Sequence, residues 1–175
     1  MKQRIKVSKY FFLDEFVDPN TFLTKDDGGL NLVDTRLFKI ADLLREKLGK
    51  PLRINNWYHY YLQLNAKGWS DDKIIKTILV SDYSKWSGLR TNLCKIGAKL
   101  SAHRKGKAID PKGDEEEMFR IVKDNAKDFY KLGVRRLEDP KITNGWLHID
   151  TLELNVTVNS IRVVDLKKVT QIIKF

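Results

Sequence analysis

The segment SAHRKGKAID, residues 101–110, places His103 seven residues before Asp110, with Gly106 between them. Imidazole nitrogen and carboxylate oxygen are both zinc ligands, so the pair could contribute to a metal site. Gly106 disfavours a continuous helix, so His103 would lie in a loop and Asp110 in the short strand that follows. Taken alone, a histidine and an aspartate at this spacing are weak evidence, and a basic turn without a metal is the alternative.

A second segment, GWLHIDTLEL at residues 145–154, supplies the third candidate ligand. In a strand, strict alternation puts Trp146, His148 and Asp150 on one face and mainly apolar residues on the other. His148 could therefore ligate a metal with Asp150 beside it, or it could be a half-buried histidine bonded to that aspartate. The remaining histidine, His59, lies among aromatic residues in WYHYY and is predicted to pack in the core.

Length and composition define the setting of these residues. The 175 residues, 42% apolar and 32% charged, are predicted to form one domain, 1–175, with a real core. The single cysteine, Cys94, excludes an internal disulfide and is predicted to pack. No apolar run is long enough to span a membrane, and the first residues lack the features of a secretory signal. We therefore expect synthesis in the cytoplasm.

The net charge of +10 favours a polyanionic partner, such as nucleic acid, an anionic cell wall or a membrane face. The lysines are spread along the chain rather than collected in a basic arm or block, and this distribution weakens the nucleic-acid interpretation. Nucleic acid is therefore not the expected partner. Charge alone leaves the choice between these partners open.

Apolar periodicity and turn residues predict the elements that position the candidate ligands. We expect long helices at residues 34–51 and 114–133, with two short helices between residues 60 and 80. The expected strands occupy residues 52–58, 107–110, 134–138, 145–154 and 161–166. Helices followed by a strand-rich half predict an α+β fold, in which helices pack with a small, mostly antiparallel sheet.

Three segments in this order, SGLR at 87–90, SAHRKGKAID at 101–110 and GWLHID at 145–150, carry a family resemblance. They resemble the zinc D-Ala-D-Ala carboxypeptidase and L-alanyl-D-glutamate peptidase family, which includes phage endolysins and is related to the hedgehog signalling domain. That family has a later tryptophan–x–histidine strand and a serine–x–histidine–x–x–glycine–x–alanine–x–aspartate motif. The central motif is matched by Ser101, His103, Gly106, Ala108 and Asp110. The resemblance covers most of the chain, apart from residues 60–86 and about the last twenty.

The resemblance implies a hedgehog/D-Ala-D-Ala peptidase-like fold and a bound Zn²⁺ held by His103, Asp110 and His148. It also implies that Arg90 steadies a substrate carboxylate or carbonyl. Ser101 would contact substrate or only shape its loop. Asp150 would hydrogen-bond to a zinc ligand and so orient it, or it would be a solvated strand residue.

The sequence departs from the family at Gly145, where many members have the catalytic glutamate three residues before the last histidine ligand. Glu138, at the end of the preceding predicted strand, is the best substitute as general base, and Asp139 is the other. If neither carboxylate reaches the metal, the site could bind zinc without hydrolysing well.

The function predicted from these features is a monomeric zinc peptidase that cleaves an amide bond in peptidoglycan stem peptides. It would reach the cell wall after release from the cell or as part of a virion. One alternative is a non-catalytic, zinc-stabilised binding or virion structural module on the same fold. Another is a basic nucleic-acid-binding domain, although the sequence lacks a base-reading motif.

Overall fold

The structure is a computed structural model that describes residues 2–81, 85–95, 101–153, 159–165 and 168–175. Its helices are α1 Pro19–Thr24, α2 Arg36–Leu48, α3 Trp57–Ala66, α4 Asp71–Val80, α5 Glu115–Asp124 and α6 Ala126–Lys131. Its strands are β1 Ala108–Ile109, β2 Arg136–Glu138, β3 Ile149–Asp150, β4 Ser160–Asp165 and β5 Lys168–Lys174. Short 3₁₀ turns are η1 Leu13–Glu15, η2 Leu30–Leu32, η3 Ala102–Lys105 and η4 Pro140–Ile142. The predicted α+β class is confirmed.

The strands form one mixed sheet in the order β1-β3-β2-β4-β5. Strand β3 pairs antiparallel with both β1 and β2, and β4 pairs antiparallel with β5. The pairing of β2 with β4 is parallel. The sheet is therefore small and mostly antiparallel, as expected, with one parallel connection that the sequence did not indicate.

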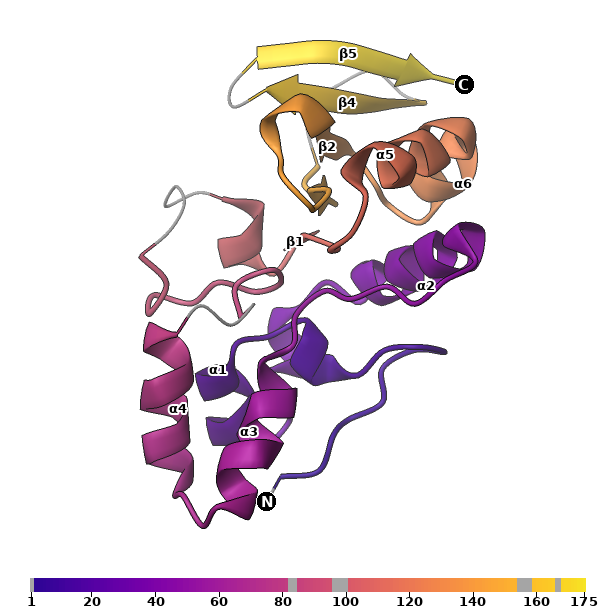
Figure 1. The fold of residues 1–175 in the computed structure, drawn as a ribbon. Coiled ribbons are helices and arrows are strands. Elements are labelled where there is room, and N and C mark those ends of the chain that lie inside the picture. Colours follow the sequence, from indigo (N-terminus) through magenta and orange to yellow (C-terminus); the bar gives the residue numbers. More distant parts are fainter. Residues whose placement is uncertain (1, 82–84, 96–100, 154–158, 166–167) are drawn as a thin grey trace.

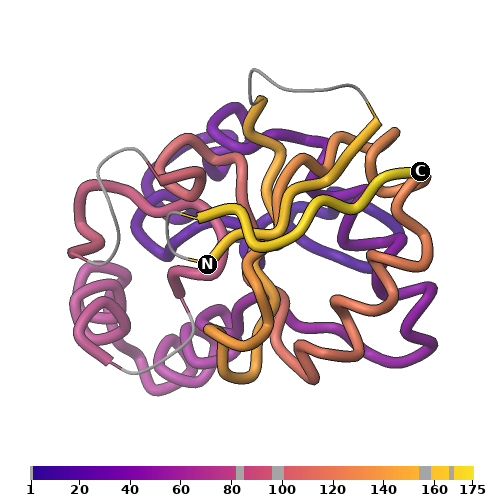
Figure 2. The backbone as a smooth tube through the Cα atoms, turned by 90° about the horizontal axis from the view of Figure 1, so that it is seen from above, coloured from indigo at the N-terminus to yellow at the C-terminus, as the bar shows by residue number. Residues whose placement is uncertain are grey.

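The helices surround this sheet unevenly. Helices α1, α3 and α4 gather at one end of the molecule, β4 and β5 lie at the other, and α2 lies between them (Figure 1). Helix α2 packs against α5, and α6 packs against β4. Viewed from above, the two C-terminal strands run across the top of the molecule (Figure 2). One cluster of buried apolar side chains extends from Phe11 to Ile173 and joins both ends.

The two strongest helix predictions are confirmed in outline. Helix α2 ends at Gly49, whose φ of +66° is the left-handed conformation that glycine adopts without strain. The predicted helix at 114–133 begins as expected, because the Asp114 side chain accepts a hydrogen bond from the backbone N–H of Glu117. Asn125 then divides it into α5 and α6: its backbone leaves the helical conformation and its side chain donates to the carbonyl of Ile121.

The strand predictions were less accurate. The strand expected at 52–58 is wrong, because Arg53 forms only an isolated bridge with Lys112 and Trp57 already begins α3. Trp57 is fully buried, and its indole N–H donates to the carbonyl of Val17, so tertiary packing determines this segment. The strand expected at 145–154 is reduced to β3, and Leu154 lies outside the described residues, as does Leu166 at the end of the strand expected at 161–166. Strand β5 was not predicted.

Two further single-residue predictions have opposite outcomes. Cys94 is buried, as expected. His59 is exposed and shares a hydrogen bond with the Gln63 side chain, so its predicted core packing is wrong. Helix α3 buries Trp57, Tyr58 and Tyr61, and His59 lies outside that face. Within the described part of the chain, no helix combines the length and apolar character needed to cross a membrane.

Candidate metal centre

The three predicted ligands come together where η3, β1 and β3 meet. His103 lies in η3, Asp110 directly follows β1, and His148 directly precedes β3. Strands β1 and β3 are antiparallel, with Ile109 opposite Ile149. The same register, continued by one residue, places Asp110 opposite His148. Strand pairing therefore explains how ligands 38 residues apart in the sequence come into contact.

The turn that carries His103 depends on Gly106. This glycine ends η3 with a φ of +64°, and a Cβ at this position would lie 1.8 Å from the carbonyl oxygen of Leu32. Any other residue would therefore displace the turn. Ser101 begins the same turn, and its side chain accepts a hydrogen bond from the backbone N–H of Arg104. This contact gives Ser101 a part in shaping the loop.

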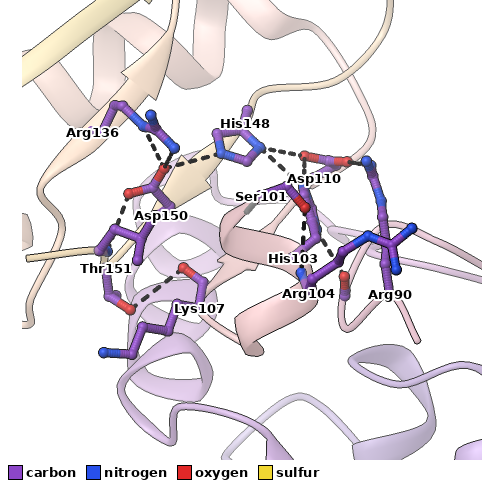
Figure 3. Close-up of polar contacts among 12 residues, drawn as sticks. Arg90, Ser101, His103, Arg104, Lys107, Asp110, Arg136, His148, Asp150 and Thr151 are labelled. Atoms are coloured by element: carbon purple, nitrogen blue, oxygen red, sulfur yellow. Dashed lines mark hydrogen bonds and ion pairs between the residues drawn. The ribbon is translucent and has the colours of Figure 1, made fainter. Parts of the chain in front are cut away.

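The ligand atoms of the three residues are close to one another and buried (Figure 3). His103 Nε2 lies 3.1 Å from both Asp110 Oδ1 and His148 Nδ1, and the latter two atoms are 2.9 Å apart. The residues are 3%, 5% and 5% exposed, respectively. Ligands of a tetrahedral zinc, at about 2.0–2.1 Å from the ion, lie about 3.3 Å from each other. The three side chains are therefore close enough to bind one metal ion.

Contacts on the outer side of each imidazole determine which nitrogen faces the cluster. His103 Nδ1 lies 2.7 Å from the carbonyl oxygen of Gly88, which can only accept, so this nitrogen carries the proton. His148 Nε2 lies 3.2 Å from Asp150 Oδ2, and the same reasoning applies. In the neutral rings, His103 Nε2 and His148 Nδ1 consequently turn lone pairs toward the Asp110 oxygen. Three acceptors facing one another are stable only with a proton or a metal ion between them.

The pKa shifts agree with this electrostatic description. Burial lowers the pKa of His103, although Asp110 acts in the opposite direction. Burial alone would also lower the pKa of His148, but its hydrogen bonds with Asp110 and Asp150 raise it to about 10. For Asp110, burial would raise the pKa, but the two histidines lower it. In the metal-free protein, a proton on His148 would be the balancing cation, and a metal ion would displace it.

Behind His148, Asp150 is held by its own partners. It is fully buried, and its Oδ2 accepts a 2.6 Å hydrogen bond from Arg136 Nε in addition to facing His148. Its Oδ1 accepts from the backbone N–H of Leu152. The sequence analysis did not identify Arg136 as part of the site. Strand alternation in VRRLE could have indicated it, because Arg136 lies opposite Asp150 in the β2–β3 pairing.

Arg90 contacts a ligand rather than open solvent. Its Nη2 donates to Asp110 Oδ2 at 2.8 Å, its Nε donates to the carbonyl of Trp86, and its side chain is 16% exposed. The SGLR segment also holds the site through its backbone. Gly88 lies so close to Phe16 that a Cβ would be 2.1 Å from its carbonyl oxygen. This close approach brings the Gly88 carbonyl to His103.

Glu138 lies on the strand next to His148, as expected. Its backbone N–H donates to the carbonyl of His148 at 3.2 Å, and the β2–β3 register places the two residues opposite each other. The Glu138 carboxylate does not belong to the metal-ligand cluster and has no hydrogen bond or ion pair with the residues that the structure describes. Asp139 is engaged elsewhere, with the backbone of Lys141 and the hydroxyl of Thr170.

No protein-family profile, curated protein sequence or solved structure matches this chain. The chemistry of the site therefore has to be argued from its own residues.

Proposed function

We propose that the chain is a zinc-dependent peptidase that hydrolyses an amide bond in peptidoglycan stem peptides. The observation that carries this proposal is the convergence of two imidazole nitrogens and one carboxylate oxygen, all about 3 Å apart. The ordered resemblance of SGLR, SAHRKGKAID and GWLHID to the zinc peptidase family supports the choice of substrate. Release from the cell or carriage in a virion would bring the enzyme to the wall.

Zinc suits this set of ligands. Imidazole ligands suit zinc, copper, iron and nickel, and two histidines with one carboxylate recur in catalytic zinc sites. Such sites keep a fourth position open for water or substrate. Bound there, a zinc ion would supply a Lewis acid that polarises a peptide carbonyl and makes water more acidic.

The side chains around the ligands would have distinct tasks. Asp150 and the Gly88 carbonyl hold the two imidazole rings in the tautomers that ligation requires. Arg90 neutralises the second oxygen of Asp110 and could also reach a substrate carbonyl. Glu138 would take a proton from the attacking water and pass it to the leaving amine. The net charge of +10 would attract an anionic cell wall.

Digestion of purified peptidoglycan tests this function, with fragments identified by mass spectrometry. We expect stem-peptide fragments from the zinc-loaded wild type and about 10²–10⁴-fold slower release by Glu138→Gln, because a general base is lost. Glu116→Gln is the matched control, since Glu116 is an exposed glutamate on α5. Equal rates for wild type and Glu138→Gln would remove Glu138 from the mechanism. No fragments from the wild type would reject the peptidase.

A non-catalytic metal-stabilised module is the second candidate. Two observations favour it: the Glu138 carboxylate lies outside the ligand cluster, and position 145 is a glycine. For this alternative, we expect about one zinc per chain, no release of fragments, and a thermal stability that depends on zinc in wild type and Glu138→Gln alike.

A further inference from the structure

An open pocket of about 420 Å³ lies beside the metal centre. It is lined by Pro51, Leu52, Arg53, Lys112, Gly113 and Gly145. Beyond β1 and β3, the two chains stay in register, because Lys112 forms a bridge with Trp146. Alternate residues of an extended chain share a face, so Lys112 follows Asp110 on the face of the metal centre. The separation along the chain is about 7 Å, the length of two extended peptide residues.

The two cations of this pocket form no ion pair with any residue that the structure describes. The Lys112 side chain is partly buried, with its ammonium 4.9 Å from the centre of the Trp146 ring. Among the described residues, neither Lys112 nor the exposed Arg53 has a side-chain hydrogen bond or ion pair. Burial lowers the pKa of Lys112, and the charge of Asp110 opposes this only in part. The Asp110 oxygens themselves contact the histidines and Arg90. A partly buried ammonium without a directly bonded anion is a costly arrangement unless a ligand supplies one.

The rest of the pocket leaves the cations accessible. A Cβ at Gly145 would meet nothing within 4 Å, and one at Gly113 would meet only Met118 Cε at 3.8 Å. The backbone N–H of Gly113 donates to the carbonyl of Gly145, and the N–H of Gly145 donates to Glu115 Oε2. The side chains of Lys112 and Arg53 are the cationic donors that this pocket offers to a ligand.

We propose that Lys112, assisted by Arg53, binds a carboxylate of the substrate while an amide bond one or two residues away lies at the metal centre. This inference rests on the proposed peptidase function and specifies its substrate class as anionic peptides. In a stem peptide, the carboxylate could be the C-terminal one or the α-carboxylate of a γ-linked D-glutamate. Both offer the same chemistry to an ammonium group.

Small probes separate the two sources of the carboxylate without being peptide substrates. N-acetyl-D-alanine represents a C-terminal carboxylate, and N-acetyl-D-glutamine represents the α-carboxylate of γ-linked D-glutamate. The α-carboxamide of each is its neutral control. Dissociation constants would be measured by titration calorimetry for zinc-loaded and metal-free protein, because the metal-free arm removes direct binding of the carboxylate to zinc.

We expect the wild type to bind at least one carboxylate probe about tenfold more tightly than its amide, as a charge-assisted hydrogen bond would give. Lys112→Gln should abolish this preference, and Lys112→Arg should retain most of it. Lys127→Gln, at an exposed lysine of α6, is the charge-matched control and should behave as wild type. The probe that shows the preference identifies the source of the carboxylate.

A wild type without carboxylate preference, or a Lys112→Gln variant of unchanged melting temperature that keeps it, would overturn the proposal. This failure is distinguishable from failure of the proposed function. If peptidoglycan is cleaved but the preference for carboxylate over amide does not depend on Lys112, the pocket assignment is wrong and the peptidase proposal stands. If the preference depends on Lys112 but no fragment is released, the anion site stands and the peptidase is wrong.

Discussion

Two buried groups of polar side chains differ in how their acceptors are satisfied. Near the N-terminus, Asp14 is 1% exposed, and both of its oxygens accept hydrogen bonds from one guanidinium, at 2.8 Å from Arg4 Nε and 2.7 Å from Arg4 Nη2. At the metal centre, Asp110 Oδ1 instead faces two imidazole nitrogens that carry lone pairs in their neutral tautomers. The first group is balanced by a fixed guanidinium, whereas the second is balanced by a proton on His148 that a metal ion would displace.

This difference separates a structural group from a binding site. Burying a carboxylate is costly unless a donor or cation compensates it. Burial raises the pKa of Asp14, and the bidentate Arg4 offsets part of this effect. The metal centre has arginines too, but Arg90 and Arg136 contact the outer sides of Asp110 and Asp150. They hold the ligands in place and leave the inner side to a cation. The comparison predicts that perturbing the two groups will have separable effects.

Removing zinc should have the largest effect. The proposed zinc would bind only the folded centre, so it should stabilise the protein by about 4 kcal/mol when free zinc exceeds its dissociation constant a thousandfold. Thermal unfolding with zinc and with a chelator measures this difference. Asp110→Asn is the control and should show a much smaller difference between the two conditions. If the wild type melts at the same temperature with zinc and with the chelator, the contrast between the two groups is wrong.

Breaking the N-terminal pair should have the next largest effect. Arg4→Met leaves the buried Asp14 without its donor and should lower the free energy of unfolding by about 3 kcal/mol, measured by denaturant titration. Zinc affinity should remain at the wild-type value, because Arg4 has no contact with the metal centre. A parallel loss of zinc affinity in the folded variant would show that the groups are coupled.

Asp150→Asn should weaken the metal centre moderately. Substitutions that disturb the partner behind a histidine ligand reduce metal affinity about 10–100-fold, equivalent to about 1.4–2.8 kcal/mol. Competition with a fluorescent zinc chelator measures the change. Arg136→Gln should act in the same direction and less strongly, since it reaches His148 only through Asp150. Unchanged affinity in both variants would mean that Asp150 does not orient the ligand.

The smallest effect concerns pH at the N-terminal group. Burial raises the pKa of Glu15 from 4.5 to about 7. A raised pKa means that the folded protein binds the proton more tightly, so this stabilisation is fully present below pH 4.5 and is lost as the pH rises through 7. We expect Glu15→Gln to flatten the dependence of stability on pH between about pH 4.5 and 7. Identical stability–pH profiles for the variant and the wild type would refute the assignment.

The sequence predicted the ligands better than their supports. His103, Asp110 and His148 could be found because a motif fixes residue types at short spacings, and they do converge in the structure. Arg136 could not be found in this way, because its role depends on the register between β2 and β3. Lys112 was missed for the same reason, since its place beside Trp146 depends on a pairing across the chain.

Prediction of secondary structure from the sequence has the same limit. Periodicity located α2 and α4, whose apolar stripes are regular. It failed at residues 52–58, where a β-like composition becomes the start of α3 because Trp57 packs into the core. It also failed at Asn125, where one side chain bonds to the helix backbone and divides α5 from α6. Both failures arise from contacts that no local pattern contains.

The central claim is that the buried cluster is a metal centre. Metal analysis after dialysis against buffered zinc tests it most directly, in wild type, His103→Ala, His148→Ala and the control His59→Ala. We predict about one zinc per chain for the wild type and for the control, because His59 is exposed and remote from the cluster. The His103 and His148 variants should retain almost none. Full zinc content in either of these variants would contradict the account.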